Sequence, residues 1–222
     1  MKKLILLGLL LIFSAQAAFA AGVPASMCDS SGESGVSKVD MSKIRDAWLG
    51  WYNDARKKNG LGTFAYDANL DRTALVWSEV AVKKGKIEHK RPGQTKYYDY
   101  KRMVSWFKEQ GLTFSQVGKS TFVENIGWDY YSCPASSADC TDNLIASIKH
   151  TYNFFIGEKG KKYHAHYDSI MNKNYKKIGL GIAVDPVKKR YYLTVHYATN
   201  VIAKSDTAKN IAACTLPGNG KF

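Results

Sequence analysis

The chain has 222 residues and a formal net charge of +13. This length suits one globular domain with a full-sized core, and the absence of a recognition motif beside the positive charge argues against a nucleic-acid partner. The basic residues indicate a solvated surface or, alternatively, attraction to lipid headgroups or an anionic cell-surface polymer. They gather at 83–91, 159–162, 173–177 and 188–190.

The first 20 residues have the pattern of a secretory signal peptide. Lys2 and Lys3 precede an apolar run of about ten residues, and residues 18–20 match the A-x-A cleavage pattern. This run is shorter than the ~20 residues that span a bilayer, and no later segment of the sequence is a candidate membrane helix. We therefore expect a secreted or periplasmic protein with no transmembrane segment after signal cleavage.

All four cysteines lie in the part expected to be exported, so two disulfides are predicted. Four cysteines allow three pairings. We favour the pairing Cys133–Cys140 with Cys28–Cys214, because Cys133 and Cys140 flank a short loop that can close locally and a bond between Cys28 and Cys214 would tie the two ends of the chain together. The absence of a CxxC spacing argues against a metal site built from these cysteines.

Apolar residues spaced three and four apart predict four helices after an irregular N-terminal arm at 21–40. The helices are expected to start at Asp40 or Ser42, Asp67 or Asn69, Asp99 and Thr141, and to end at Gly60, Gly85, Gly111 and Gly157. Alternating apolar residues at 178–184, a turn, and a β-rich run at 190–198 predict an antiparallel hairpin. One domain is expected over 41–202, followed by a C-terminal tail at 203–222.

The five histidines differ in predicted role. His89 lies just past the second helix, where a surface or helix-capping histidine is the commoner case. His164 and His166 are separated by a rotation of ~200° on a helix, so both cannot face one cleft. His150 lies off the apolar stripe of its helix and is expected to be exposed, and His196 is predicted to be a hydrogen-bonded strand histidine.

Glu124 is a lone acid among the apolar and aromatic residues of 122–131. Burying a carboxylate costs several kcal/mol unless it is paired or binds a metal, which would make Glu124 a site residue. The alternative is that Glu124 lies on the exposed face of a short strand.

Several short motifs follow one another along the chain: WYNDAR at 51–56, NGL at 59–61, His89, ENI at 124–126, AHY at 165–167, IGLG at 178–181 and YLTVHYATN at 192–200. In this order they resemble the CAP superfamily, which includes cysteine-rich secretory proteins, venom allergens and plant pathogenesis-related proteins. The resemblance covers about 44–200 and implies an α+β fold, a three-layer α-β-α sandwich with a mainly antiparallel central sheet.

The resemblance also implies a cleft with two histidines and two acids, which in many members holds a divalent metal. Carried over by motif, the histidines are His89 and His166 and the first acid is Glu124. The position of the second acid falls on Phe154. Glu158 lies beyond the expected helix end and would complete the site by reaching in from a loop; otherwise the site has three polar members.

Two imidazoles and a carboxylate suit Zn²⁺ or another divalent metal and could activate water. The H-E-x-x-H and G-x-S-x-G catalytic motifs are absent, so we assign no catalytic residue. Three functions stay open. They are a binding module for a lipid, sterol or cell-surface ligand, a metal-dependent hydrolase of peptide or cell-envelope substrates, and a structural or adhesive surface protein with a vestigial cleft.

Overall fold

The computed structural model describes residues 36–115, 121–134, 136–185, 187–203 and 214–217. The predicted signal peptide and Cys28 lie outside the described residues. Among the described helices, none is long and apolar enough to cross a membrane.

The centre of the molecule is a four-stranded sheet in the order β2-β5-β6-β4. The strands are β2 (Ala65–Tyr66), β4 (Phe122–Tyr130), β5 (Lys177–Asp185) and β6 (Arg190–Ala198). Strands β5 and β6 form the predicted antiparallel hairpin, and β4 pairs antiparallel with β6 along its whole length. Because β2 runs parallel to β5, the sheet is mixed and one of its three pairings departs from the expected antiparallel arrangement.

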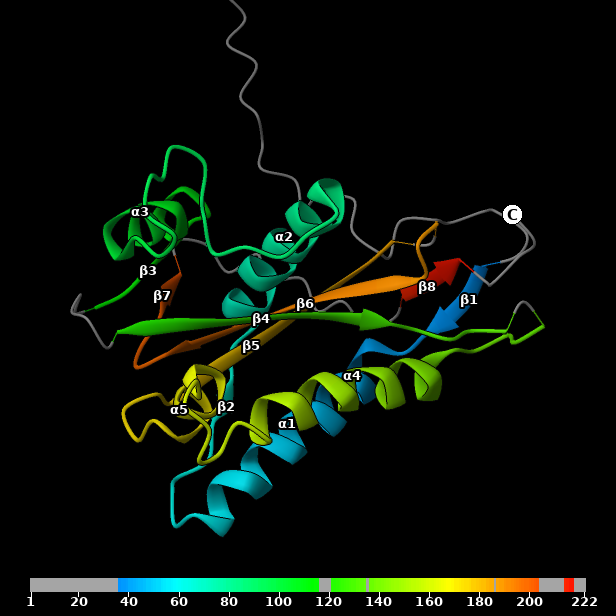
Figure 1. Ribbon diagram of the computed structural model, residues 1–222, viewed down its shortest axis with the longest axis horizontal. Helices are drawn as coiled ribbons and strands as arrows, with labels where there is room; N and C mark the ends of the chain where they lie inside the picture. Colours follow the sequence, from blue (N-terminus) through cyan, green and yellow to red (C-terminus); the bar gives the residue numbers. More distant parts are fainter. Residues whose placement is uncertain (1–35, 116–120, 135, 186, 204–213, 218–222) are drawn as a thin grey trace, which may run out of the picture.

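Helices cover both faces of this sheet, as the α-β-α prediction required (Figure 1). On one side lie α2 (Ala68–Lys84) and α3 (Tyr100–Glu109), and on the other lie α1 (Met41–Lys58), α4 (Thr141–Ile156) and α5 (Ala165–Met171). Each side has its own cluster of buried apolar residues against the sheet. The expected three-layer α+β fold is therefore confirmed.

Aspartates begin three of the helices. The side chains of Asp40, Asp67 and Asp99 accept hydrogen bonds from backbone N–H groups in the first turns of α1, α2 and α3. The sequence predicts Thr141 as the cap of the fourth helix, but Cys140 occupies that position. The Thr141 hydroxyl instead accepts a hydrogen bond of 2.7 Å from the backbone N–H of Asp40, so it connects the starts of α4 and α1.

Two glycines of β5 allow α2 to lie directly on the sheet. A Cβ added at Gly179 would be 2.1 Å from the backbone nitrogen of Asp71, and one added at Gly181 would be 2.0 Å from that of Leu75. The IGLG motif is therefore a close-packing motif, because any larger side chain would push helix and sheet apart.

The end of the N-terminal arm is a strand, which the sequence did not predict. Strand β1 (Val36–Val39) pairs antiparallel with β8 (Cys214–Pro217), so segments near the two ends of the chain lie side by side. Likewise β3 (Leu112–Thr113) pairs with β7 (Ile202–Ala203). These short strands depend on partners distant in sequence, and such pairings leave no local pattern.

The disulfide between Cys133 and Cys140 is present, as predicted. A bond between Cys28 and Cys214 stays a prediction, because Cys28 is outside the described residues.

Candidate functional site

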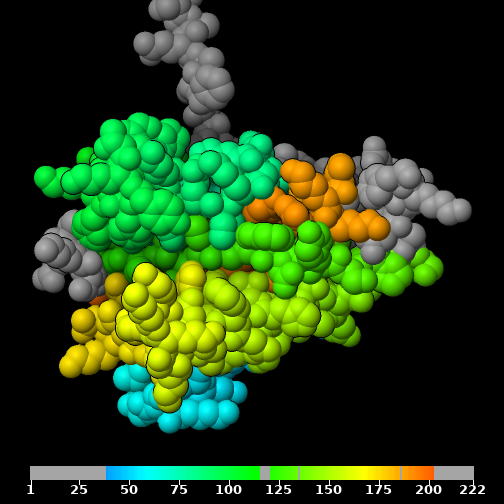
Figure 2. Space-filling view, in the orientation of Figure 1, coloured from blue at the N-terminus to red at the C-terminus, as the bar shows by residue number. Residues whose placement is uncertain are grey.

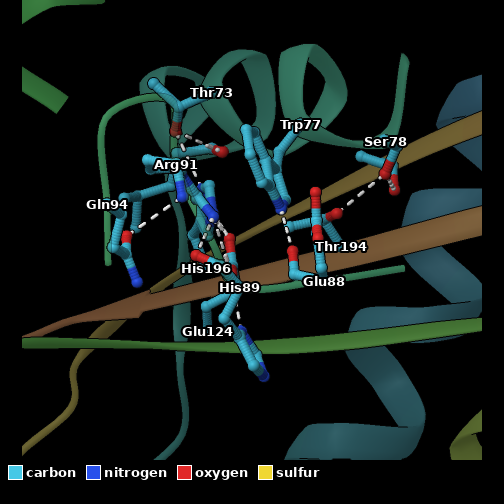
Figure 3. A network of polar contacts seen from close by, with 12 residues as sticks. Thr73, Trp77, Ser78, Glu88, His89, Arg91, Gln94, Glu124, Thr194 and His196 are labelled. Atoms are coloured by element: carbon cyan, nitrogen blue, oxygen red, sulfur yellow. Dashed lines mark hydrogen bonds and ion pairs between the residues drawn. The ribbon is translucent and has the colours of Figure 1, made fainter. Parts of the chain in front are cut away.

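The first half of the site surrounds Glu124, a fully buried residue of β4 (Figure 3). Its Oε1 atom is 2.8 Å from His89 Nδ1, and its Oε2 atom is 2.8 Å from His196 Nε2. The guanidinium of Arg91 binds both oxygens, with Nη1 3.0 Å from Oε1 and Nη2 2.5 Å from Oε2. The sequence left two alternatives for Glu124, a buried acid with partners and an acid on an exposed strand face. The structure shows the first.

Arg91 is the residue of this cluster that the sequence analysis missed. It lies in the basic segment 83–91, which the sequence predicts to be solvated surface, yet it is only 2% exposed. Its Cζ atom is 3.6 Å from the ring centroid of Trp77 and 4.3 Å from that of Trp106, so the cation lies between two aromatic rings. The partners come from α2, α3 and β4, and that convergence is visible only in the folded chain.

The surroundings of Glu124 and His196 shift the pKa values of both side chains. Burial alone would raise the pKa of Glu124, but the charge of Arg91 and the hydrogen bonds from His196, His89 and Arg91 outweigh it and hold the pKa well below its usual value. Burial lowers the pKa of His196, against the opposing effect of Glu124. His196 is therefore a neutral, fully buried strand histidine that donates from Nε2 to Glu124, while its Nδ1 lies 3.0 Å from the Thr73 hydroxyl.

The second half of the site joins Glu158 and His166. Glu158 lies just beyond the end of α4, and its Oε1 atom is 2.6 Å from His166 Nδ1. Its Oε2 atom accepts from the backbone N–H groups of His166 and Tyr167, at 3.0 and 3.4 Å. The ring of Phe155 stacks on the imidazole with centroids 4.4 Å apart. The loop acid therefore contacts the histidine, as one of the two sequence-based alternatives proposed.

Both imidazoles line one cavity of about 680 Å³. His89 comes from the loop after α2 on one side of the sheet, and His166 comes from α5 on the other. Between them the wall is formed by five consecutive residues of β4, 126–130. Figure 2 shows this face, with the green segments after α2 above the strand and the yellow α5 region below it.

The remaining histidines lie around this site or outside it. His164 is exposed and pairs with Asp168 at 2.8 Å, in agreement with its surface assignment. His150 is also exposed, as expected, but it lines the cavity near Asp129, which lies 3.7 Å away. Phe154, at the position expected for an acid, is 60% exposed and contributes an apolar wall.

The profile of the cysteine-rich secretory protein (CAP) family matches residues 49–197, which is more than half of the chain. The chain belongs to this family. No curated protein matches the sequence of this CAP protein.

The chain is also similar to solved structures at low sequence identity. An outer surface protein from Borrelia burgdorferi is 12% identical, with a TM-score of 0.51 over 74% of this chain and 98% of that one. The CAP domain of enterococcal PrgA is 15% identical (TM-score 0.46; 78% and 75% covered). An extracellular SCP-domain protein from Bacillus anthracis is 16% identical (TM-score 0.41), and the match covers 72% of this chain but 41% of that one.

Each of the two cavity imidazoles has a ring nitrogen that could bind a divalent cation. Each histidine uses Nδ1 for its glutamate, so a neutral ring has its Nε2 lone pair available for a metal. Neither Nε2 atom has a hydrogen-bond partner within the part of the chain that the structure describes. That part also has no group of three or more His, Cys, Asp or Glu side chains arranged around a metal position. The described residues would therefore offer a cation in this cavity no more than the two imidazoles as ligands of these types.

Proposed function

We propose that this CAP protein is an exported binding module whose cleft takes a ligand at the His89–His166 pair, with Zn²⁺ or another divalent cation held by the two Nε2 atoms. The observation that supports this proposal is that each imidazole is oriented by a glutamate and both line one cavity. With only two protein ligands, the remaining coordination positions would go to water or to the bound molecule.

The hydrogen bonds of the two glutamates favour binding over hydrolysis. A metal-dependent hydrolase needs a carboxylate that can take a proton from water. Both oxygens of Glu124 and both of Glu158 already accept hydrogen bonds from side chains or backbone N–H groups. Neither glutamate is among the residues that line the cavity, and Asp129, the carboxylate that does line it, is five residues from Glu124, about 16 Å along an extended strand.

The proposal is tested by calorimetric titration of Zn²⁺ into the mature, oxidised protein at neutral pH. We expect one-to-one binding, and its loss in His89→Ala and in His166→Ala. His164→Ala is the matched control, because His164 is two positions from His166 but exposed and paired with Asp168. Binding that is absent, or that survives both cleft substitutions, would remove the cation from the proposal.

A further inference from the structure

The wall of the cleft is the outer edge of the sheet, because β4 is the last strand in the order β2-β5-β6-β4. In an antiparallel pair, alternate residues direct their N–H and C=O groups toward the partner strand. The backbone N–H of Thr199 donates to the C=O of Thr121 at 2.9 Å, and that of Tyr131 donates to the C=O of Lys189 at 3.1 Å. Odd-numbered residues of β4 therefore face β6, and even-numbered residues face the cleft.

Two residues of this edge present backbone groups to the cavity. Ile126 and Trp128 are even-numbered and line it, and the described part of the chain provides no hydrogen-bond partner for the N–H or C=O of either. Tyr130 is the next even-numbered residue, and its backbone N–H donates a hydrogen bond to the Asp129 carboxylate at 2.8 Å. The unpaired length of the strand edge therefore ends before Tyr130. A short length of strand edge is thus unpaired at the wall of the cleft, where Trp128 is 41% exposed and Ile126 is 5% exposed, and such edges accept further strands.

We infer that the cleft binds an extended peptide segment of negative net charge, which adds to β4 as a fifth strand of the sheet. This inference rests on the proposed function and names its ligand class. The backbone N–H and C=O groups of such a bound peptide would pair with those of Ile126 and Trp128. Its successive side chains would point alternately to the two sides of the cleft.

The two sides of the cleft offer different surfaces for those side chains. On the α2–α3 side lie His89, Ile87 and Tyr97, and on the α4–α5 side lie His166 and Phe154. Without Lys2 and Lys3 of the expected signal peptide the formal net charge falls from +13 to +11, and this positive charge favours an anionic segment over a cationic one.

The first test uses a phage-displayed library of linear 12-residue peptides, selected on the mature, oxidised protein. The tightest peptide is then synthesised with N-methyl groups at alternate positions, in two registers. An added strand directs every second N–H to β4, so we expect one register to weaken binding at least about tenfold and the other to leave it unchanged. Failure to select peptides, selection of cationic ones, or equal effects of both registers would overturn the inference.

The second test changes the strand edge of the protein. Trp128→Pro removes an N–H that faces the cleft and takes no part in the β4–β6 ladder, and edge strands tolerate proline there. Trp128→Ala removes the same ring but keeps the N–H. We expect the proline variant to bind the selected peptide about tenfold more weakly than the alanine variant. Equal affinities of the two folded variants would overturn the inference, and if the proline variant does not fold, the methylated peptides decide.

The outcome can be separated from that of the proposed function. If the wild-type protein binds Zn²⁺ through its two histidines but no library peptide, this inference fails and the proposed cation site stands. If it binds peptide in one methylation register but no Zn²⁺, the cation fails and strand addition stands.

Discussion

Arg91→Met is expected to be one of the most destabilising single substitutions in this protein. Arg91 is buried, binds both oxygens of Glu124, and lies between the rings of Trp77 and Trp106. Methionine fills much of the space but leaves the Glu124 carboxylate buried without its cation. Removing one partner of a buried ion pair costs about 3–5 kcal/mol, a large part of the roughly 5–15 kcal/mol that stabilises a typical domain.

The assay is urea unfolding at pH 7 followed by tryptophan fluorescence. Arg102→Met is the matched control, since Arg102 forms a partly exposed pair with Glu109, and such pairs contribute about 1 kcal/mol or less. Arg91→Lys keeps the charge but not the bidentate contact and should lie between wild type and Arg91→Met. If Arg91→Met and Arg102→Met were equally stable, the argument that Arg91 compensates a buried charge would be refuted.

The same pair gives a pH dependence with a definite sign. Because the folded-state pKa of Glu124 is depressed, its contribution is complete above the unfolded value of 4.5 and is lost as the pH falls below it. In Arg91→Met most of this stabilisation by the Glu124 carboxylate is already lost. The difference in free energy of unfolding between wild type and Arg91→Met should therefore be largest at neutral pH and shrink toward pH 3. A difference that does not change with pH would contradict this account.

Two further substitutions test the α4–α5 side of the site. Gly127→Ala would place a Cβ 2.6 Å from the Thr151 Cγ2 methyl, and we expect the free energy of unfolding in urea to fall by about 1–3 kcal/mol. Adding Thr151→Ser removes that methyl and should recover part of the loss. A double variant as unstable as Gly127→Ala alone would count against this steric explanation. Glu158→Gln weakens the charged acceptor of His166 and should lower Zn²⁺ affinity about 10–100-fold by calorimetry, whereas unchanged affinity would mean that Glu158 does not orient the imidazole.

Local patterns predicted helices α1 to α4 and the β5–β6 hairpin, but not the short helix α5, because helix caps and hydrophobic periodicity are properties of short segments and α5 has only seven residues. The motif order also pointed to His89, Glu124 and His166, while Glu158, the only acid between Asp142 and Asp168, was one of two alternatives for completing the site. Arg91 could not be found in this way. A basic residue in a run of lysines has no local mark of burial, and its partners are assembled from three separate elements.

The open edge of β4 was equally hidden from the sequence. The sequence offered a short strand there as one of two interpretations of Glu124, but whether a strand is internal or at an edge depends on the order of the whole sheet. The role of His196 could be predicted in part. Its alternation in the strand predicted a hydrogen-bonded histidine, while the identity of its partner, Glu124, required the register of β4 against β6.

Two adjacent residues of β4 hold the two halves of the cleft. Glu124 binds His89 on one face of the sheet, and the side chain of Asn125 donates to the backbone C=O of His166 on the other, at 3.1 Å. Because side chains alternate along a strand, a slip of one residue between β4 and β6 would exchange the two faces and separate both contacts. The cleft can therefore form only when β4 is in its native register, so occupancy of the cleft would report that the last strand of the sheet has paired correctly.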